Sequence, residues 1–327
     1  MSDHLHLGDF TQKIGASPIP NYYGDALVTL AKNNPKIVAF TGDLTPATEC
    51  DLFRDTFPDR FFNSGIAEAN MIGVAAGMAR CGDVPFVHSF SVFLTRRAFD
   101  QVAMQVAYPR LNVKLAGFLP GLTTLLGVSH QSIDDFALMR SLPNMTIIEP
   151  SGPSQMAAAL RAAASIDGPV YLRMHKATET ISTAKIEHKI ELGKGQMLSN
   201  GNDAVIFACG HMVAEALEAA RLFEKVGISI AVANMHTLKP FDTDFVIEHA
   251  TRTGVAISAE NHSIIGGLGS AISEALAERQ ANTSVKFKRL GIMDTFAEGG
   301  STPYLFNKYG LSAQHLFSSI SDLLEIK

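Results

Sequence analysis

The chain has 327 residues, of which 46% are hydrophobic, and a formal net charge of −5. This length and this share of apolar side chains suffice for about two domains with buried cores. The charge provides no basic field for nucleic acid, and no apolar run approaches the roughly 18 residues of a membrane-spanning helix, so neither nucleic acid nor a membrane is expected as a partner.

The first half of the sequence alternates short apolar runs with longer helical patterns. The apolar runs predict strands at Ile37–Thr41, Pro85–His88, Val113–Gly117, Met145–Glu149 and Val170–Arg173. The periodic stretches between them predict helices at Asp25–Lys32, Glu68–Arg80, Phe99–Ala107 and Pro153–Ala164. This alternation predicts a doubly wound α/β domain with a parallel sheet over residues 1–180.

A second α/β series follows a polar connection. The stretch from Ala177 to Gly201 has no long apolar run, and we expect a linker at 181–200. The next domain, 201–327, is predicted to contain strands at Ala204–Ala208, Ser229–Asn234, Val255–Ser258 and Val285–Arg289, and helices at Met212–Val226 and Leu268–Glu278. The fold class is therefore α/β, with two consecutive doubly wound domains.

Glu68 is the residue that most needs an explanation. It lies between Ile66–Ala67 and a run of small and apolar residues, Met71–Met78, which predicts a helix buried against another backbone. A carboxyl group in apolar surroundings tends to keep its proton and can share it with a neutral ring nitrogen. A helix-start Glu that complements the macrodipole is the alternative.

Aromatic residues follow about twenty-five positions later. Phe90, Phe93 and Phe99 are spaced so that a helix or turn presents the first two rings together. Such a pair is either an apolar wall of a site or ordinary core packing.

At these residues the sequence resembles the pyrimidine-binding domain of thiamine-diphosphate enzymes of the transketolase type, in NSGIAEANM and then HSFSVFLTRRAFDQV. The similarity continues in the same order almost to the end of the chain, in the strings GDLTPAT, SHQSIDDFALMRSLPNMTIIEPS, VYLRMHK, MHTLKPFD and AENHSIIGGLGSAISEAL. The resemblance implies a pyrimidine-binding fold followed by a transketolase C-terminal domain.

The magnesium-binding motif of the family is absent from this sequence. These enzymes hold the diphosphate through Mg²⁺ bound by a GDG motif and a later Asn, whereas this chain has GDL at Gly42 and GDV at Gly82 and no GDG. The resemblance therefore implies the C-terminal section of a split enzyme, with no metal ligands of its own. It implies a partner subunit that carries the Mg²⁺ and diphosphate site, and a cytoplasmic heterotetramer of two such chains and two partners.

The resemblance also implies roles for individual residues. Glu68 is expected to bond the cofactor's aminopyrimidine ring and assist proton removal from its reactive carbon, with Phe90 and Phe93 as the aromatic wall. Asp43 matches a family carboxylate near the cofactor and the subunit interface, although a turn-capping Asp is an equal alternative. His130, before Gln131, is expected near the first hydroxyls of the sugar, although an exposed loop His is the alternative.

Departures from the family concern the substrate: Leu126 replaces an acidic residue that contacts a donor hydroxyl, and the other changes affect contacts to an acceptor phosphate. Arg173 matches an Arg that binds the acceptor phosphate, with a salt bridge as the alternative reading. Other family contacts are replaced here, by Leu126 in the loop before His130, by Ala47 and Phe118, and by Pro20–Asn21.

Three cations occupy positions where the family usually has small or uncharged residues, namely His88, Arg96 and Arg97. They could form a different anion site. The sequence therefore predicts ketol transfer on an unusual anionic sugar, either branched, sulfonated or differently phosphorylated.

Three alternatives remain open. The β subunit of a 2-oxoacid dehydrogenase E1 component has the same two-domain layout and also needs a partner. The chain could also be a fragment of a deoxyxylulose-phosphate synthase, which has a similar sequence around Phe93. A non-catalytic scaffold could retain the fold, although it has no reason to keep a costly buried carboxyl group such as that of Glu68.

Overall fold

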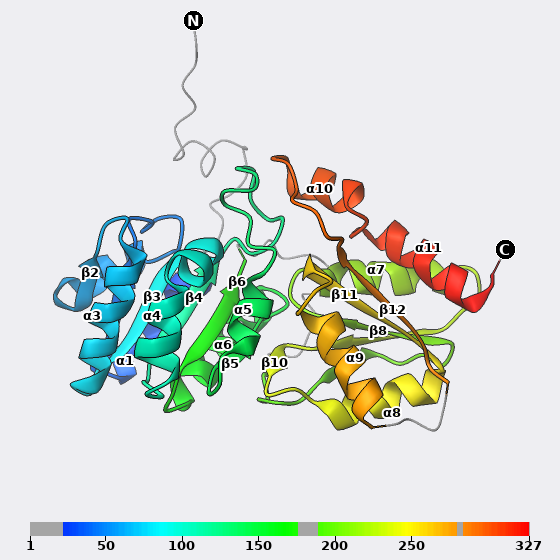
Figure 1. Cartoon of the computed structure of the whole chain (residues 1–327), viewed down its shortest axis with the longest axis horizontal. Helices are drawn as coiled ribbons and strands as arrows, with labels where there is room; N and C mark the ends of the chain where they lie inside the picture. The colour runs from blue at the N-terminus through cyan, green and yellow to red at the C-terminus, as the bar shows by residue number, and fades with distance from the viewer. Residues whose placement is uncertain (1–21, 176–188, 280–283, 327) are drawn as a thin grey trace, which may run out of the picture.

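The computed structural model describes residues 22–175, 189–279 and 284–326. Two α/β domains lie side by side, the first coloured blue to green and the second largely yellow to red (Figure 1). Both are built around a parallel-rich sheet, as the sequence predicts.

The first sheet has seven strands in the order β10-β5-β6-β4-β3-β1-β2. Six are parallel, and β10 is antiparallel to β5. The strands are β1 (Ile37–Thr41), β2 (Phe61–Asn63), β3 (Val84–Phe90), β4 (Lys114–Phe118), β5 (Thr146–Ile148), β6 (Val170–Met174) and β10 (Thr237–Lys239).

Helices cover both faces of this sheet because successive side chains of its central strands are apolar on both sides. In β1, Ile37 and Ala39 join one buried cluster, whereas Val38 and Phe40 join another. The helical segments are α1 (Tyr22–Asn33), α2 (Asp51–Thr56), η2 (Pro58–Arg60), α3 (Glu68–Arg80), η3 (Phe93–Arg97), α4 (Phe99–Gln101), η4 (Val102–Ala107), α5 (Asp135–Ser141) and α6 (Pro153–Ser165).

The second sheet has five strands in the order β12-β11-β8-β9-β7, of which β7 is antiparallel to β9. Its strands are β7 (Gln196–Ser199), β8 (Ala204–Ala208), β9 (Ile230–Asn234), β11 (Val255–Ser263) and β12 (Lys286–Ile292). Its helices are α7 (Met212–Glu224), α8 (Thr243–Thr253), α9 (Leu268–Glu278), α10 (Thr302–Lys308) and α11 (Ala313–Leu324).

The two domains share a continuous apolar seam. Strand β10 comes after β9 in the chain but pairs with β5 of the first sheet. Leu238 of β10 and Met235 just before this strand belong to the same buried cluster as Leu142 and Met145 of the first domain. The relative placement of the domains is therefore fixed by backbone pairing as well as by buried apolar surface.

Most predicted elements are confirmed, several with identical bounds, for example β1, α3, β8 and α9. The predicted helix Phe99–Ala107 instead begins as one short α-helical turn and continues as the wider π-helical segment η4. Residues 196–199, within the predicted linker, form β7. The domain boundaries themselves stay a prediction, because 176–188 lie outside the described residues.

Two further observations bear on the sequence expectations. Cys50, Cys81 and Cys209 are free cysteines, of which Cys50 and Cys209 are buried and Cys81 is exposed. None of the helices in the described ranges is long and apolar enough to cross a membrane.

Candidate active site

The predicted site residues gather at the carboxyl edge of the first sheet. Strand β1 ends at Thr41 and is followed by Gly42 and Asp43, β3 ends at Phe90, and the loop after β4 carries His130. The chain runs from β1 to β2 on one side and then to β3 on the other. Such a reversal of strand order is the usual place of a ligand site in an open parallel sheet.

Glu68 is the first residue of α3 and is only 1% exposed. Its Oε2 accepts a hydrogen bond from a guanidinium nitrogen of Arg97 at 2.7 Å, and its Oε1 accepts one from the hydroxyl of Ser89 at 3.3 Å. The N-terminus of α3 adds a partial positive charge. The buried carboxylate is therefore compensated by a cation and a helix dipole, while Oε1 keeps only a long bond.

Phe90 and Phe93 form the predicted aromatic pair beside this carboxylate. Their rings stack with centroids 5.9 Å apart and planes 27° apart. The guanidinium of Arg97 lies 4.2 Å from the centroid of the Phe93 ring. The aromatic wall therefore presents an apolar ring surface, and Arg97, which contacts the Phe93 ring, also bonds Glu68.

His130 closes the other side of this aromatic pair. Its imidazole meets Phe93 at 5.3 Å and Phe90 at 6.0 Å, both nearly edge to face. Burial and the charge of Arg97 lower the pKa of His130 below its usual value, so that the ring is neutral at neutral pH. Nδ1 lies 2.9 Å from the hydroxyl of Ser129, which leaves Nε2 as the ring nitrogen for a ligand.

The loop that carries His130 is held by the second domain. Asn261 of β11 accepts a hydrogen bond from the backbone N–H of Leu122 at 2.9 Å and donates one to the carbonyl of Pro120. The side-chain amide of Gln131 donates to the carbonyl of Glu298 at 2.9 Å. The C-terminal domain therefore helps to position a predicted site residue of the first domain.

Asp43 lies at the same carboxyl edge of the first sheet, where its side chain is hydrogen-bonded to Asn63 at the end of β2. Its backbone N–H donates to Asn63, whose amide donates back to the Asp43 carboxylate, both at 3.2 Å. At the preceding position, a Cβ on Gly42 would lie 3.4 Å from Oε1 of Glu68. The absence of a side chain at residue 42 leaves space next to that oxygen.

The structure places two of the predicted substrate contacts elsewhere. His88 is fully buried, with its ring nitrogens 2.6 Å from the hydroxyl of Tyr23 and 2.8 Å from the carbonyl of Phe40. Burial lowers the pKa of His88 to about 4, which keeps it uncharged. Arg96 bonds both carboxylate oxygens of Asp134, at 2.8 and 2.9 Å.

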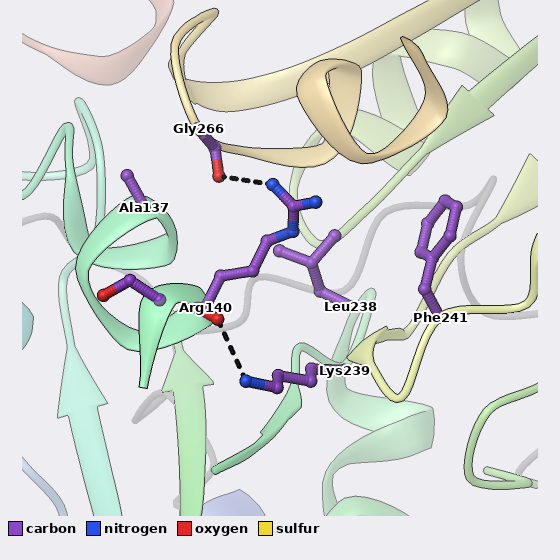
Figure 2. A pocket seen from close by; sticks show the side chains of 7 residues that line it. Ala137, Arg140, Leu238, Lys239, Phe241 and Gly266 are labelled. Carbon is purple, nitrogen blue, oxygen red and sulfur yellow. Dashed lines mark hydrogen bonds between the residues drawn. The ribbon is translucent and has the colours of Figure 1, made fainter. Parts of the chain in front are cut away.

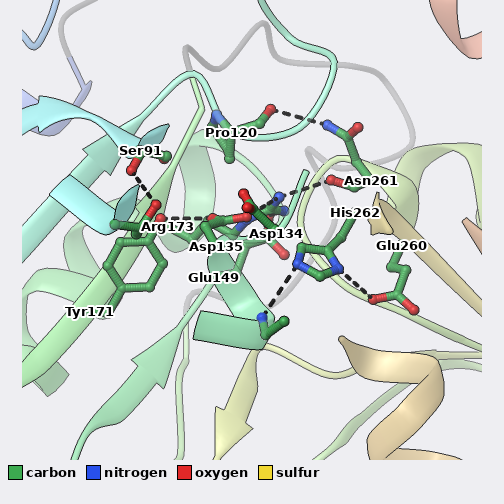
Figure 3. A network of polar contacts seen from close by, with 12 residues as sticks. Ser91, Pro120, Asp134, Asp135, Glu149, Tyr171, Arg173, Glu260, Asn261 and His262 are labelled. Atoms are coloured by element: carbon green, nitrogen blue, oxygen red, sulfur yellow. Dashed lines mark hydrogen bonds and ion pairs between the residues drawn. The ribbon is translucent and has the colours of Figure 1, made fainter. Parts of the chain in front are cut away.

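Arg173 is also buried, at the end of β6, where it is the centre of a polar network between the domains (Figure 3). It bonds Asp135 at 2.7 and 3.1 Å, Glu149 at 2.7 Å and the carbonyl of Asn261 at 2.8 Å. Its guanidinium also lies 4.3 Å from the Phe136 ring centroid. This geometry favours the salt-bridge reading of Arg173 over phosphate binding, which stays a prediction.

The pKa values of the two carboxylates of this network are shifted in opposite directions. Arg173 and Tyr171 lower the pKa of Asp135 despite the opposing effect of burial, which is the largest single influence. Burial raises the pKa of Glu149, which has one bond to Arg173 and an Oε2 without a hydrogen-bond partner. We therefore assign the ion pair to Asp135 and treat Glu149 as the weakly compensated partner.

A cavity of about 330 Å³ lies away from the aromatic pair, between α5 and β10 (Figure 2). It is lined by Ala137, Arg140, Ser141, Leu238, Lys239, Phe241 and Gly266. Lys239 already donates to the carbonyls of Arg140 and Leu142 at 3.0 and 2.5 Å, and Arg140 pairs with Glu274. Because both cations are bonded within the chain, this cavity is a poor candidate for the sugar site.

Sequence reasoning missed the partners that fix these residues. Ser89 and the Arg97–Glu68 pair could not be inferred from spacing, although RR at 96–97 marked an unusual pair of cations. Asp135 and Asn261 carried no recognisable signal for a contact with Arg173.

In the described part of the chain, no group of three or more His, Cys, Asp or Glu residues could hold a metal ion. Pro20–Asn21, at one altered family position, lie outside the described residues.

Comparisons with known proteins identify the family of both domains. The sequence matches the family described as "Transketolase, pyrimidine binding domain" over residues 18–179 and that described as "Transketolase, C-terminal domain" over residues 193–316. It is 42% identical over 319 residues to the 6-deoxy-6-sulfo-D-fructose transketolase subunit SqwH of Clostridium sp. (strain MSTE9), covering 97% of this chain and 98% of the relative.

The chain covers different shares of the length of two other relatives. It is 39% identical to a putative transketolase C-terminal section of Methanocaldococcus jannaschii, covering 92% of this chain and 94% of the relative. It is 37% identical to a 1-deoxy-D-xylulose-5-phosphate synthase of Geobacter sulfurreducens, covering 96% of this chain but only 49% of the synthase.

A solved structure described as a split gene transketolase, inactive beta4 tetramer, superposes with a TM-score of 0.84 at 42% identity, covering 94% of this chain and 98% of the other. Matches in sequence and in fold therefore extend over both domains. The chain belongs to the transketolase family, of which it matches the pyrimidine-binding and C-terminal domains.

Proposed function

We propose that this chain is one subunit of a cytoplasmic, thiamine-diphosphate-dependent transketolase that moves a two-carbon ketol unit from a ketose to an aldose. The observation that carries the proposal is the buried carboxylate of Glu68 beside the stacked rings of Phe90 and Phe93, with the neutral imidazole of His130 on their other side. A buried carboxylate is costly, and a structural role alone gives no reason to place it at a ligand edge.

The residues present fit the pyrimidine half of thiamine diphosphate. Glu68 offers Oε1, which has only a 3.3 Å bond from Ser89, and Gly42 leaves space beside that oxygen. Phe90 and Phe93 offer ring faces on which a planar heterocycle can stack. The sequence contains no GDG motif, so we assign Mg²⁺ and the diphosphate to a partner subunit.

When bound, the cofactor supplies the nucleophilic carbon and the electron sink for cleavage next to a ketose carbonyl. The chain's own residues would perform the remaining tasks. Glu68 would hold a proton at the pyrimidine ring nitrogen through Oε1, and the Phe90–Phe93 pair would orient the ring and exclude water. His130, neutral because burial and Arg97 lower its pKa, would hydrogen-bond a sugar hydroxyl through Nε2.

Exposed apolar side chains around the site support the need for a partner. Ile66, two residues before Glu68, is 74% exposed, and Leu125 and Val128 in the loop of His130 are 48% and 46% exposed. Apolar side chains grouped around a ligand edge are typical of a surface that another chain covers. The solved relative is described as a split gene transketolase in the form of an inactive beta4 tetramer. We propose a heterotetramer of two such chains and two partners.

The donor that we favour is a ketose with a terminal sulfonate. The 42% identical Clostridium relative is named for 6-deoxy-6-sulfo-D-fructose. Phe118, at a position where the family binds an acceptor phosphate, packs its ring against Tyr23 at 5.0 Å. Arg173, which matches the family at another such position, is held by Asp135. These differences disfavour the usual pentose phosphates.

The proposal can be tested by coexpression with the partner that carries the GDG motif. Ketol transfer would be followed with 6-deoxy-6-sulfofructose, fructose 6-phosphate and xylulose 5-phosphate as donors, at equal acceptor, cofactor and Mg²⁺. We expect cofactor-dependent transfer and the highest kcat/KM for the sulfonated donor. Equal or better turnover of xylulose 5-phosphate would refute the substrate assignment but not the reaction class.

A second candidate function is supported by the 37% identity to deoxyxylulose-phosphate synthase. That relative is named for the synthesis of 1-deoxy-D-xylulose 5-phosphate and not for ketol transfer. The same complex, given pyruvate and glyceraldehyde 3-phosphate, would release CO₂ if this candidate were right. We expect no release above background.

A further inference from the structure

Two consecutive arginines of the π-helical turn η3 bond two different carboxylates. Arg96 bonds Asp134 immediately before α5, and Arg97 bonds Glu68 at the start of α3. π-helical turns are rare and often occur at functional sites. Here the turn places one cation on the predicted catalytic carboxylate.

Arg97 is held in place independently of Glu68. Its guanidinium lies 4.2 Å from the centroid of the Phe93 ring, a distance at which a cation is attracted to the ring face. The side chain is 44% exposed, whereas the Glu68 side chain is 1% exposed. Arg97 therefore reaches from the mouth of the site to a carboxylate at its base.

The two oxygens of Glu68 are in different environments. Oε2 receives the charge-assisted bond from Arg97 at 2.7 Å, whereas Oε1 has only the 3.3 Å bond from Ser89 and faces the space beside Gly42. A carboxylate with one oxygen fixed by a guanidinium has a fixed plane. One orientation of Glu68 is therefore selected before any ligand arrives.

We propose that Arg97 is a positioning residue for Glu68: it holds Oε2, presents Oε1 to the pyrimidine ring, and compensates the charge of the carboxylate while the ring is absent. This inference rests on the proposed function, since it concerns the same cofactor. Arg97 acts through Glu68 and is not itself in contact with the reacting atoms.

The role predicts non-additive effects on cofactor affinity. In the assembled complex with Mg²⁺, the Kd for thiamine diphosphate would be measured by calorimetry for wild type, Arg97→Met, Glu68→Gln and the double variant. Loss of a charge-assisted bond to a buried group predicts binding about 10- to 100-fold weaker for Arg97→Met. If Arg97 acts only through Glu68, the double variant binds no more weakly than Glu68→Gln.

Two further variants separate positioning from general damage. Arg97→Lys keeps the charge but loses the planar fork, so we expect binding between wild type and Arg97→Met. Arg221→Met makes the same change at an exposed helical ion pair with Glu218 and should leave Kd unchanged. Circular dichroism of each complex would establish that the fold is retained.

The pH dependence of cofactor binding gives a readout that a structural role would not move. The charged or titratable groups around Glu68 are Arg97 on η3, His130 in the loop after β4 and Asp43 after β1. Removing the cation disfavours the ionised carboxylate, so the midpoint of the binding profile should move to higher pH in Arg97→Met. Because Arg97 also lowers the pKa of His130, the same pair of profiles would be measured in a His130→Gln background, where a remaining shift is assigned to Glu68.

Each outcome decides one question. Tighter binding by Arg97→Met would mean that Arg97 competes with the ring for Glu68, and additive losses in the double variant would mean that it acts elsewhere; both overturn the inference. If the wild-type complex binds no cofactor, the proposed function fails instead. The ion pair can still be checked then, by a double-mutant cycle of urea unfolding on the isolated chain, in which coupling of Arg97 and Glu68 is expected.

Discussion

Replacing Arg173 by Met should destabilise this chain severely, because it would leave buried carboxylates without their cation. Arg173 is 1% exposed at its side chain, and Asp135 and Glu149 are 0% and 3% exposed, so solvent screens neither pair. Three of its bonds go to these carboxylates at 2.7 to 3.1 Å. Breaking one buried pair by removing a partner costs about 3–5 kcal/mol, a large share of the stability of a typical domain.

The assay is urea unfolding of the purified chain at pH 7, followed by circular dichroism. We expect the free energy of unfolding to fall by about 3–5 kcal/mol in Arg173→Met. Arg221→Met, at an exposed pair, should change little. Adding Asp135→Asn and Glu149→Gln to Arg173→Met should recover part of the loss, because no uncompensated charge then remains. A loss below about 1 kcal/mol would refute the reasoning.

Three other perturbations test the site and its surroundings. Glu68→Ala in the complex should lower kcat by at least about 10²-fold while the circular dichroism spectrum of the folded complex is retained, and a smaller change in kcat would mean that Glu68 does not take part in proton transfer. His130→Ala should raise KM for the ketose by about tenfold, read from initial rates, whereas an unchanged KM would exclude contact with the sugar. Burial raises the pKa of Glu260 to about 7, from 4.5. The folded state then holds the extra proton between those values, so stability should fall as pH rises from about 4.5 to 7. Glu260→Gln should flatten this fall in thermal melts; an unchanged slope would contradict the assignment.

The convergence of Glu68, Phe90, Phe93 and His130 could be predicted from sequence. Each lies at or after the carboxyl end of a strand of one parallel sheet, and the carboxyl ends of such strands meet at the same edge. The segments that resemble the transketolase family indicated the expected roles of these residues. Phe90 and Phe93 also lie three residues apart, which brings their rings together in a turn, as the structure has them.

The surroundings of Arg173 could not be predicted, because they depend on packing between distant segments. Its partners Glu149, Asp135 and Asn261 lie 24, 38 and 88 residues away in sequence. A strand residue faces one side of its sheet or the other according to register, which a short apolar run does not specify. The same uncertainty applies to His88, which points into the core towards Tyr23.

Some short elements could not be predicted from the sequence, for a related reason. Strands β7 and β10 have four and three residues, too few to show alternation, and both pair antiparallel at a sheet edge. Their existence depends on a neighbouring strand rather than on local preference. The π-helical turns η3 and η4 likewise follow from packing of Leu94, Val102 and Val106 into the core.

The central claim is that this chain completes an active site only together with a partner. The most direct measurement is ketol transfer from 6-deoxy-6-sulfofructose with thiamine diphosphate and Mg²⁺, for this chain alone, the partner alone and the purified complex. We predict turnover by the complex only, and its loss in Glu68→Ala. Turnover by either chain alone, or a stable complex that binds cofactor but transfers from no ketose, would contradict the account.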